Sequence, residues 1–316
     1  MKNEKIRPLL KGSIKMIPGV KMLLKKGTGG TINSRYCYSV WLRHLTKLNN
    51  VGGKIPNAIA ELGPGDSLGI GLAALLTGCN KYNALDVIKY WDSQRNLQIF
   101  EELVTLFKKR TPIPDNTEFP LVRPEIENYN FPSEIISEAQ LKDSLSENRL
   151  AIIRKEISNI ESSANKHIFY QIPWYDSKVI EYNSVDFIYS QAVLEHVEDL
   201  ENTYSAMNKW LKSSGLMSHA IDFTSHGITT SWNGHWIFSD FEWNIVKGGK
   251  VYLINRYPFT YHIKLHKKFG FDILKKSFDT SENQLSHGQL SKKYKSLTVE
   301  ELSTSGMYIL SKKVIL

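Results

Sequence analysis

The sequence predicts an α/β fold in which helices cover a mostly parallel sheet that ends in an antiparallel strand. An apolar run at residues 57–62 leads into a glycine-rich turn and a helix, as a buried parallel strand does. A second short strand, residues 82–87, contains an acid near its end. Two apolar runs, residues 269–278 and 307–316, are typical of a closing antiparallel pair. Open sheets of this kind bind ligands at the carboxyl ends of their parallel strands.

The turn after the first strand is suited to a nucleotide-like ligand. Gly63 and Gly65 lack a Cβ and adopt positive φ readily, so the backbone can approach a bound molecule closely. The helix that begins near Ser67 presents unpaired N–H groups to such a molecule. Asp86, 25 residues after Glu61, is placed to bind ribose hydroxyls. The pattern indicates a nucleoside pocket, and a glycine-rich turn that binds no ligand is the alternative.

The same loop favours a cationic nucleoside over a dinucleotide. A dinucleotide-binding turn has the pattern Gly-x-Gly-x-x-Gly, but Leu68 stands at the third glycine position and Pro64 removes one backbone donor. The carboxylate of Glu61 repels phosphate and attracts a ligand that has an amino group and a sulfonium. We therefore expect no pyrophosphate in this pocket.

A second motif supports this interpretation. Residues 185–189 have the apolar pattern of a strand, and a helix start with Leu-Glu-His at residues 194–196 follows it. Together with Glu61 and the glycine turn, and with Asp86, this motif resembles the motifs of class I S-adenosylmethionine-dependent methyltransferases that have Leu-Glu-His after strand four. The resemblance covers residues 57–90, 168–226 and 269–316. It implies a Rossmann-like sheet of seven strands with helices on both faces and a reversed final strand.

The resemblance also implies a cofactor, S-adenosylmethionine, and the residues that contact it. For one of them, Trp174, a purely structural role is equally compatible with the sequence. The family's motifs match this chain so that the methionine part would be contacted by Glu61, Gly63 and Gly65, the ribose by Asp86, the adenine by Ile172 and Trp174, and the reactive methyl group by Ser190 and Gln191.

Length and composition favour one domain with an insertion. The 316 residues, 41% of them apolar, exceed what a minimal domain of this kind needs. Residues 92–165 separate strands two and three, and they contain amphipathic helical segments at 97–109 and 141–160 around a proline-rich loop. This helical insertion either roofs the acceptor pocket or only stabilises the domain. We assign residues 31–316 to the methyltransferase domain.

The positive charge is concentrated in a basic N-terminal arm, residues 1–30. Residues 1–26 contain eight basic side chains and one acid, which accounts for +7 of the net charge of +8. The rest of the chain is nearly neutral, which argues against nucleic acid as a partner. Prolines and glycines interrupt the apolar residues of the arm and argue against one long helix, a membrane span or a secretion signal. The arm either contacts a membrane surface or packs on the domain.

The cysteine content indicates a reducing compartment. Cys37 and Cys79 show neither a disulfide pattern nor the spacing of a metal site. We expect a cytoplasmic protein, located at the inner face of the membrane if the arm binds there.

Periodicity predicts the remaining elements. A helix near the start of the domain should cover the cofactor side of the sheet, with His44 as a satisfied polar residue. In chain order, the expected elements are a helix over 36–45, a helix to residue 76 after the glycine turn, strand three over 168–174, a helix over 203–211 and strand five over 215–223.

Methyl transfer to a hydroxyl needs a base near the fifth strand. Transfer from a sulfonium is an in-line displacement, so the enzyme positions the acceptor and removes its proton. His226 lies four residues after Asp222, whose carboxylate can orient the imidazole and raise its basicity. His226 is therefore the first candidate for the general base. His196 and His219 are further catalytic candidates, with helix packing and a core position as the respective alternatives.

The spacing of His219, Asp222 and His226 also resembles a set of metal ligands. Because residues three apart in a strand point to opposite faces, His219 and Asp222 cannot share an ion. We expect no metal in that set.

An aromatic and polar segment suggests the acceptor. Trp232, His235 and Trp236 lie in a glycine-containing loop suited to stacking on a sugar ring, while Asn255 and Arg256 can contact a phosphate or carboxylate. Tryptophans that fill the core of a lid are the alternative.

The motifs Leu-Glu-His at 194–196, Ser-His-x-Ile-Asp at 218–222 and Asn-Arg at 255–256 resemble those of methyltransferases in bacterial surface-polysaccharide biosynthesis. This implies O-methylation of a sugar or sugar-phosphate hydroxyl in cell-envelope polysaccharide biosynthesis, with a glycan precursor as acceptor. Methyltransferases of nucleic-acid amino groups have Asn-Pro-Pro-Tyr or Asp-Pro-Pro-Tyr after strand four, where residues 190–193 read Ser-Gln-Ala-Val. Methylation of a small-molecule or lipid metabolite, and an inactive cofactor-binding module at the membrane surface, remain alternatives.

Overall fold

The computed structural model describes residues 2–15, 30–174, 176–248 and 253–314. Its strands belong to one sheet. They are β1 (Ala58–Leu62), β2 (Lys81–Leu85), β3 (Ile168–Gln171), β4 (Val185–Gln191), β5 (Leu211–Asp222), β6 (Phe271–Thr280) and β7 (Thr304–Lys313).

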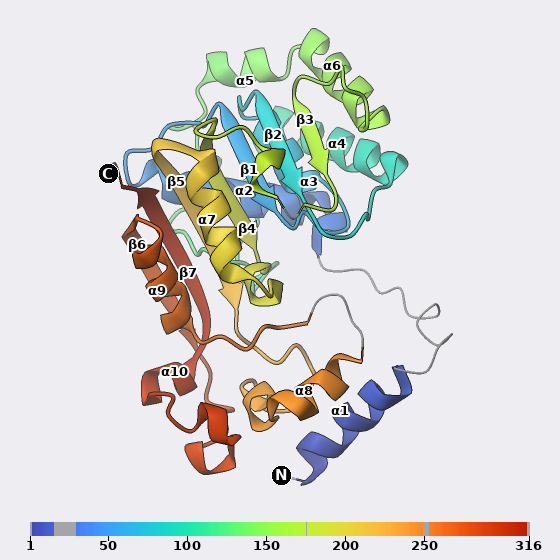
Figure 1. Ribbon diagram of the computed structural model, residues 1–316. Helices are drawn as coiled ribbons and strands as arrows, with labels where there is room; N and C mark the ends of the chain where they lie inside the picture. The colour runs from blue at the N-terminus through green and yellow to red at the C-terminus, as the bar shows by residue number, and fades with distance from the viewer. Residues whose placement is uncertain (1, 16–29, 175, 249–252, 315–316) are drawn as a thin grey trace.

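The strand order is β3-β2-β1-β4-β5-β7-β6 (Figure 1). Strands β1 to β5 pair in parallel, and β7 runs antiparallel to both of its neighbours. The predicted fold class, a Rossmann-like seven-stranded sheet with an antiparallel final strand, is confirmed. The order changes direction at β1 and β4, so the loops after these two strands meet at the carboxyl edge of the sheet.

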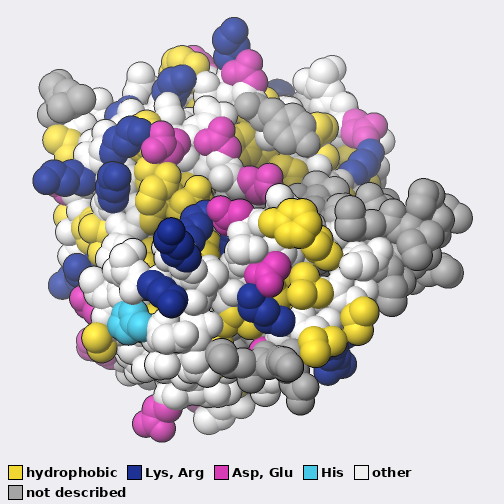
Figure 2. Space-filling model, turned by 60° about the horizontal axis from the view of Figure 1, so that its bottom comes forward, with side chains coloured by type: hydrophobic (Ala, Val, Ile, Leu, Met, Phe, Trp, Pro, Cys, Tyr) yellow, Lys and Arg dark blue, Asp and Glu magenta, His cyan; other side chains and the backbone are white. Residues whose placement is uncertain are grey.

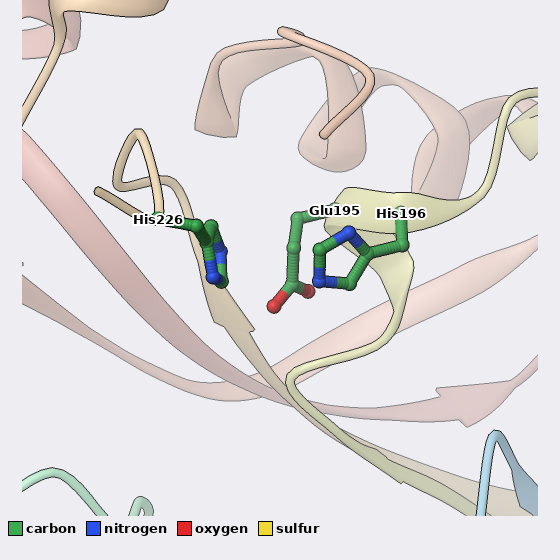
Figure 3. Close-up of side chains that lie close together, drawn as sticks. All are labelled: Glu195, His196 and His226. Atoms are coloured by element: carbon green, nitrogen blue, oxygen red, sulfur yellow. The ribbon is translucent and has the colours of Figure 1, made fainter. Parts of the chain in front are cut away.

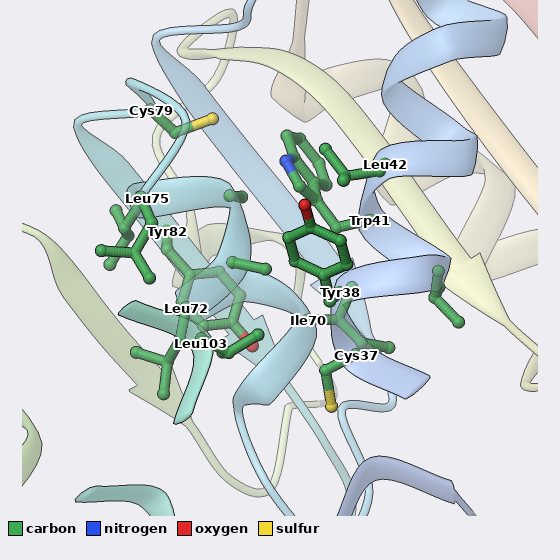
Figure 4. Close-up of a cluster of buried hydrophobic side chains, with 14 of the residues drawn as sticks. Cys37, Tyr38, Trp41, Leu42, Ile70, Leu72, Leu75, Cys79, Tyr82 and Leu103 are labelled. Carbon is green, nitrogen blue, oxygen red and sulfur yellow. The ribbon is translucent and has the colours of Figure 1, made fainter. Parts of the chain in front are cut away.

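One face of the sheet is covered by α2 (Ser34–Asn49), α3 (Gly69–Leu75), α4 (Ser93–Lys108) and α6 (Glu147–Ser158). Figure 4 shows Trp41 of α2 and Leu72 of α3 in this core, together with Tyr82 of β2. Both cysteines are buried there as free thiols. A Cβ added at Gly71 would lie 2.0 Å from the Tyr82 ring, so the glycine allows α3 to approach the sheet.

The other face is covered by α7 (Leu200–Trp210) and α9 (Phe259–Lys268), which Figure 1 shows in front of the strands. The segment between β5 and α9 adds α8 (Asp240–Lys247), and α10 (Val299–Ser303) precedes β7. This second core continues beyond the edge of the sheet and reaches the loops that follow β4 and β5.

The insertion lies on the α2 side of the sheet. It contributes α4, then a loop, α5 (Glu138–Ser144) and α6, so the single helix expected over 141–160 is instead two helices. In the loop, backbone carbonyls accept hydrogen bonds from the buried guanidinium of Arg43, at 2.8 Å for Val122 and Pro114. Whether the insertion also covers an acceptor stays a prediction.

The described part of the N-terminal arm is α1 (Lys2–Lys15), which packs on α8. This helix continues through Pro8 and Gly12, where a break was expected. A Cβ at Gly12 would lie 2.0 Å from the Ile245 carbonyl oxygen, so glycine permits the two helices to touch. Lys5 binds Glu242 at 2.8 Å and holds the helix in place. Residues 16–29 of the predicted basic arm lie outside the described residues.

Charge on the face that bears α1 and α8 is mixed. Figure 2 shows basic and acidic side chains interspersed with hydrophobic ones there. Among the residues that the structure describes, no helix is long and apolar enough to cross a membrane.

Candidate active site

The glycine turn and the acid of the second strand meet at the carboxyl edge of the sheet. Gly63 and Gly65 have φ of 63° and 72°, the left-handed region expected of them. Asp86 Oδ2 accepts a hydrogen bond from the Gly65 N–H at 3.3 Å, and Oδ1 accepts one from Val87 N–H at 2.7 Å. Burial raises the pKa of Asp86. The two motifs therefore form one loop pair of the kind that binds a nucleoside.

Glu61 supports this turn from inside the protein. Its carboxyl is 2% exposed and accepts a hydrogen bond from the Tyr82 hydroxyl. Burial raises the pKa of Glu61 to about 8. Its predicted contact with the methionine part of a cofactor stays a prediction, because the carboxyl faces Tyr82 and is shielded from solvent.

The segment after β3 lies beside the end of β2. The Trp174 N–H donates to the Asp86 carbonyl at 3.2 Å, and the Trp174 ring meets Trp210 edge to face with centroids 5.3 Å apart. Ile172 and Trp174 are half-buried. They are adjacent to the predicted ribose acid, and their role as walls of an adenine pocket stays a prediction.

Ser190 and His219 form a closed pair in the core. Ser190 Oγ lies 2.8 Å from His219 Nδ1, and both side chains are fully buried. Burial lowers the pKa of His219 well below its usual range. The expectation that His219 takes part in catalysis is corrected, because an imidazole enclosed in this way cannot reach an acceptor.

On the opposite face of β5, a chain of hydrogen bonds links four elements. Gln191 Oε1 lies 3.3 Å from His44 Nε2, and His44 Nδ1 lies 2.7 Å from Ser218 Oγ. Ser218 in turn donates to the Tyr308 hydroxyl at 2.9 Å. The prediction of His44 as a satisfied polar residue is confirmed. Gln191 is half-buried at the end of β4, and its contact with the methyl group stays a prediction.

A cluster of acids and histidines lies where β4 and β5 end. We call Glu195, His196, Asp222 and His226 the acid–histidine cluster. Glu195 and His196 belong to η4 (Leu194–His196), a single 3-10 turn where a helix start was expected. Asp222 ends β5, and His226 follows in a turn at φ 49°. The cluster thus joins the edges of two adjacent parallel strands.

The cluster combines a buried acid with a half-exposed pair. Glu195 is 2% exposed, and neither of its carboxyl oxygens has a hydrogen-bond partner among the described residues. Burial and the nearby charge of Asp222 raise its pKa well above its usual range. Asp222 Oδ2 lies 3.7 Å from His226 Nε2, and the His196 and His226 ring centroids are 4.9 Å apart. Figure 3 shows Glu195, His196 and His226 directed toward a common space.

Asn255 holds the turn that positions Glu195 and His196. Its Nδ2 donates to the carbonyls of Leu194 and Val197, both at 2.8 Å, and its backbone N–H donates to the Glu195 carbonyl at 2.6 Å. Asn255 was expected to bind substrate. Its amide holds the η4 turn in place, and the residue also lines the cavity described below, so its predicted contact with substrate stays a prediction.

The aromatic segment is also mostly internal. Trp236 is fully buried, donates from Nε1 to the Arg256 carbonyl at 2.9 Å and stacks on Tyr294. Trp232 packs edge to face on Trp236. The expected open stacking platform is corrected, because Trp232 and Trp236 fill a buried core, as in the alternative that the sequence left open.

Arg256 is likewise engaged within the protein. Its guanidinium donates to the Phe238 carbonyl at 2.8 Å, pairs with Asp240 and lies over the Trp243 ring. These contacts leave its predicted role in binding an acceptor phosphate without direct support from the geometry.

A cavity of about 10 Å³, roughly the space of one water molecule, lies beside the cluster. Glu195, Asp222, His235 and Tyr257 line it. His235 is buried, and burial lowers its pKa to about 3, so the imidazole is neutral there. Tyr257 is half-buried and stacks on Tyr261 with centroids 4.2 Å apart and 14° between the rings. Carboxyl groups, a neutral imidazole and an aromatic edge thus surround one space.

Comparisons with known proteins agree with this arrangement. Residues 145–218, which include β3, β4, the η4 turn and α7, match a family described as a methyltransferase domain. No curated protein sequence matches the chain. The match covers 74 of the 316 residues, and together with the strand order it supports a methyltransferase that uses S-adenosylmethionine as cofactor.

Solved structures of low sequence identity also resemble the chain. A Galdieria sulphuraria protein described as a sarcosine dimethylglycine methyltransferase is 13% identical, with a TM-score of 0.45 over 87% of this chain and 85% of that one. A Listeria monocytogenes protein described as an S-adenosylmethionine-dependent methyltransferase is 15% identical, with a TM-score of 0.43 over 90% and 100%. Phosphoethanolamine N-methyltransferase 2 of Haemonchus contortus is 13% identical, with a TM-score of 0.42 over 92% and 62%. The conclusion on the fold rests on the strand order of this chain.

Proposed function

We propose that this protein methylates a hydroxyl of a sugar or sugar phosphate in cell-envelope polysaccharide biosynthesis, with S-adenosylmethionine as the methyl donor. The observation that supports this proposal is the position of the acid–histidine cluster beside the glycine turn at residues 63–65. A Cβ at Gly63 would lie 2.7 Å from the Val193 side chain, so the turn touches the segment that leads into Glu195. An acceptor held by the cluster would be next to the cofactor.

The cluster suits a hydroxyl acceptor. S-adenosylmethionine supplies an electrophilic methyl group, and a hydroxyl must lose its proton to become methylated. Asp222 and His226 are the half-exposed members of the cluster, with side chains 40% and 31% exposed. This pair accepts the proton, with the carboxylate orienting the imidazole. Glu195 and His235 are buried beside the pair.

The surroundings favour a sugar over a flat aromatic acceptor. Sugars bind through an aromatic contact on the ring and polar contacts at its hydroxyls. Tyr257, backed by Tyr261, provides the aromatic surface beside the carboxyls of Glu195 and Asp222. This aromatic contact replaces the one first expected from Trp232 and Trp236.

The test is a panel of acceptors incubated with the full chain and methyl-labelled S-adenosylmethionine. The panel contains nucleotide sugars, sugar phosphates and lipid-linked glycans, with phenols, amines and phospholipids as the competing classes. Label on a sugar hydroxyl, located by mass spectrometry of the product, supports the proposal. Label only on an amine, a phenol or a phospholipid contradicts it, and cofactor binding without any transfer indicates an inactive module.

A further inference from the structure

We propose that Glu195, His196 and His226 bind one divalent transition-metal cation. Each side chain offers one donor atom, and these atoms all lie within 4.8 Å of one another. The residues come from two loops that the sheet brings together, the η4 turn after β4 and the turn after β5. Figure 3 shows the Glu195 carboxyl between the two imidazole rings.

The unpaired carboxyl of Glu195 is the independent sign of a ligand. A buried carboxyl normally pairs with a basic group or accepts several hydrogen bonds, because an isolated buried charge is costly. Among the described residues Glu195 has no basic side chain and no hydrogen bond of good geometry at either oxygen, although it is 2% exposed; only the backbone N–H groups of Glu195 and Asp222 act on its carboxyl. The nearby Arg256 is committed to Asp240 and to the Phe238 carbonyl. A cation between Glu195 and the histidines would displace the proton of the carboxyl and pair with the carboxylate that remains.

The donor set selects the class of ion. Two imidazoles and one carboxylate suit first-row transition metals such as Zn²⁺ and Mn²⁺ better than Ca²⁺, which prefers oxygen ligands alone. Asp222 lies beside His226 and can orient its ring, as carboxylates commonly do for metal-bound imidazoles.

The geometry requires a modest closure. Ligand atoms around a bound transition metal lie about 3 Å apart, so the side chains must approach one another by about 1 to 2 Å. His226 can provide this movement, because it stands on an exposed turn and its side chain is 31% exposed. The buried Glu195 stays fixed by the contacts that Asn255 makes with the η4 turn.

Three protein ligands leave positions for an acceptor. The catalytic consequence rests on the proposed function: an acceptor hydroxyl bound to the ion would become more acidic and would be held toward the cofactor turn. When the ion is bound, His226 is one of its ligands, so of the pair assigned above as proton acceptor only Asp222 is left to take the proton of the hydroxyl; without the ion His226 takes it. Ion binding itself does not depend on that function.

The experiment measures binding of the metal alone. The full chain is freed of metal with a chelator that is then removed, and titrated with Mn²⁺ and with Zn²⁺ by calorimetry, without cofactor or acceptor. Electron paramagnetic resonance of free Mn²⁺ gives the stoichiometry. The variants are Glu195→Gln and His226→Asn, since asparagine tolerates the positive φ of that turn. His287→Gln, which removes an imidazole in η6 (His287–Gln289), is the matched control.

We expect one ion per chain in the wild type and in His287→Gln, and affinity at least about 10- to 100-fold weaker in Glu195→Gln and His226→Asn. Thermal unfolding in chelator should show Glu195→Gln as stable as the wild type or more so, because it removes a buried acid. Absence of saturable binding up to about 1 mM metal, or equal affinity in Glu195→Gln, overturns the site. Methyl transfer without metal binding would leave the proposed function standing, and metal binding without methyl transfer would leave the site standing.

Discussion

Asp222 and His226 face each other at the end of β5, with 3.7 Å between Oδ2 of the acid and Nε2 of the imidazole. The two residues lie four apart in the sequence, and the turn after β5 brings their side chains together. In this turn Asp222 Oδ1 also accepts a hydrogen bond from Thr224 N–H at 2.8 Å. The carboxyl therefore serves both the turn and the imidazole.

This pair gives the first prediction. His226→Asn should lower kcat by about 10²- to 10⁴-fold, the usual contribution of a general acid or base, with the affinity for S-adenosylmethionine unchanged. Calorimetry and steady-state kinetics on the same preparation separate the two quantities. Wild-type kcat in this variant would remove His226 from the mechanism.

Asp86 should determine cofactor affinity. Its carboxyl already accepts the Gly65 N–H at the mouth of the glycine turn. Asp86→Ala removes the group placed for the ribose hydroxyls and should weaken binding of S-adenosylmethionine by about 1.5 to 3 kcal/mol. Asp272→Ala, on the exposed side of β6, is the control. Equal affinity in the two variants would refute the ribose assignment.

The buried acid Glu61 should make stability depend on pH. Its pKa is raised from 4.5 to about 8 in the folded protein, so the folded state binds a proton more tightly than the unfolded state does. The stabilisation is therefore full below about pH 4.5 and is lost as pH rises toward 8.

Glu61→Gln isolates this effect. The free energy of unfolding of the wild type, relative to Glu61→Gln, should fall by up to about 1.4 kcal/mol per pH unit across that window. Urea unfolding of both proteins at several pH values between 5 and 8 measures it. A difference that stays constant with pH contradicts the raised pKa.

Asn255 is predicted to act as a positioning residue. Asn255→Ala breaks two hydrogen bonds to the η4 turn and should cost about 1 to 3 kcal/mol of stability, with reduced turnover because Glu195 and His196 lose their support. Asn283→Ala breaks one exposed hydrogen bond to Thr230 and serves as the comparison. Full activity and full stability of Asn255→Ala would contradict the role.

Gly71 should tolerate no side chain. Gly71→Ala places a Cβ 2.0 Å from the Tyr82 ring, beneath the helix that follows the cofactor turn. We expect a loss of about 1 to 3 kcal/mol from this overpacking. Gly288→Ala, where nothing lies within 4 Å of the added Cβ, should be nearly neutral in the same thermal unfolding measurement.

Several features followed from the sequence because they depend on neighbours along the chain. The glycine turn, the acid after the second strand and the reversed final pair all rely on local periodicity and on residues with special backbone freedom. The pairing of Asp222 with His226 also depends on neighbours along the chain, since four residues span one turn. The seven-stranded sheet with its reversed final strand then followed from the resemblance that these motifs support.

The direction of a buried side chain is a different kind of property, and only the tertiary structure decided it. Trp236, Arg256 and Asn255 looked available for an acceptor, but each finds its partners in segments distant along the chain. The sequence predicted no role for Glu195, because the burial of its carboxyl depends on the two loops that follow β4 and β5. Local spacing fixes which residues are near in sequence, whereas burial and hydrogen-bond satisfaction are set by the whole packed core.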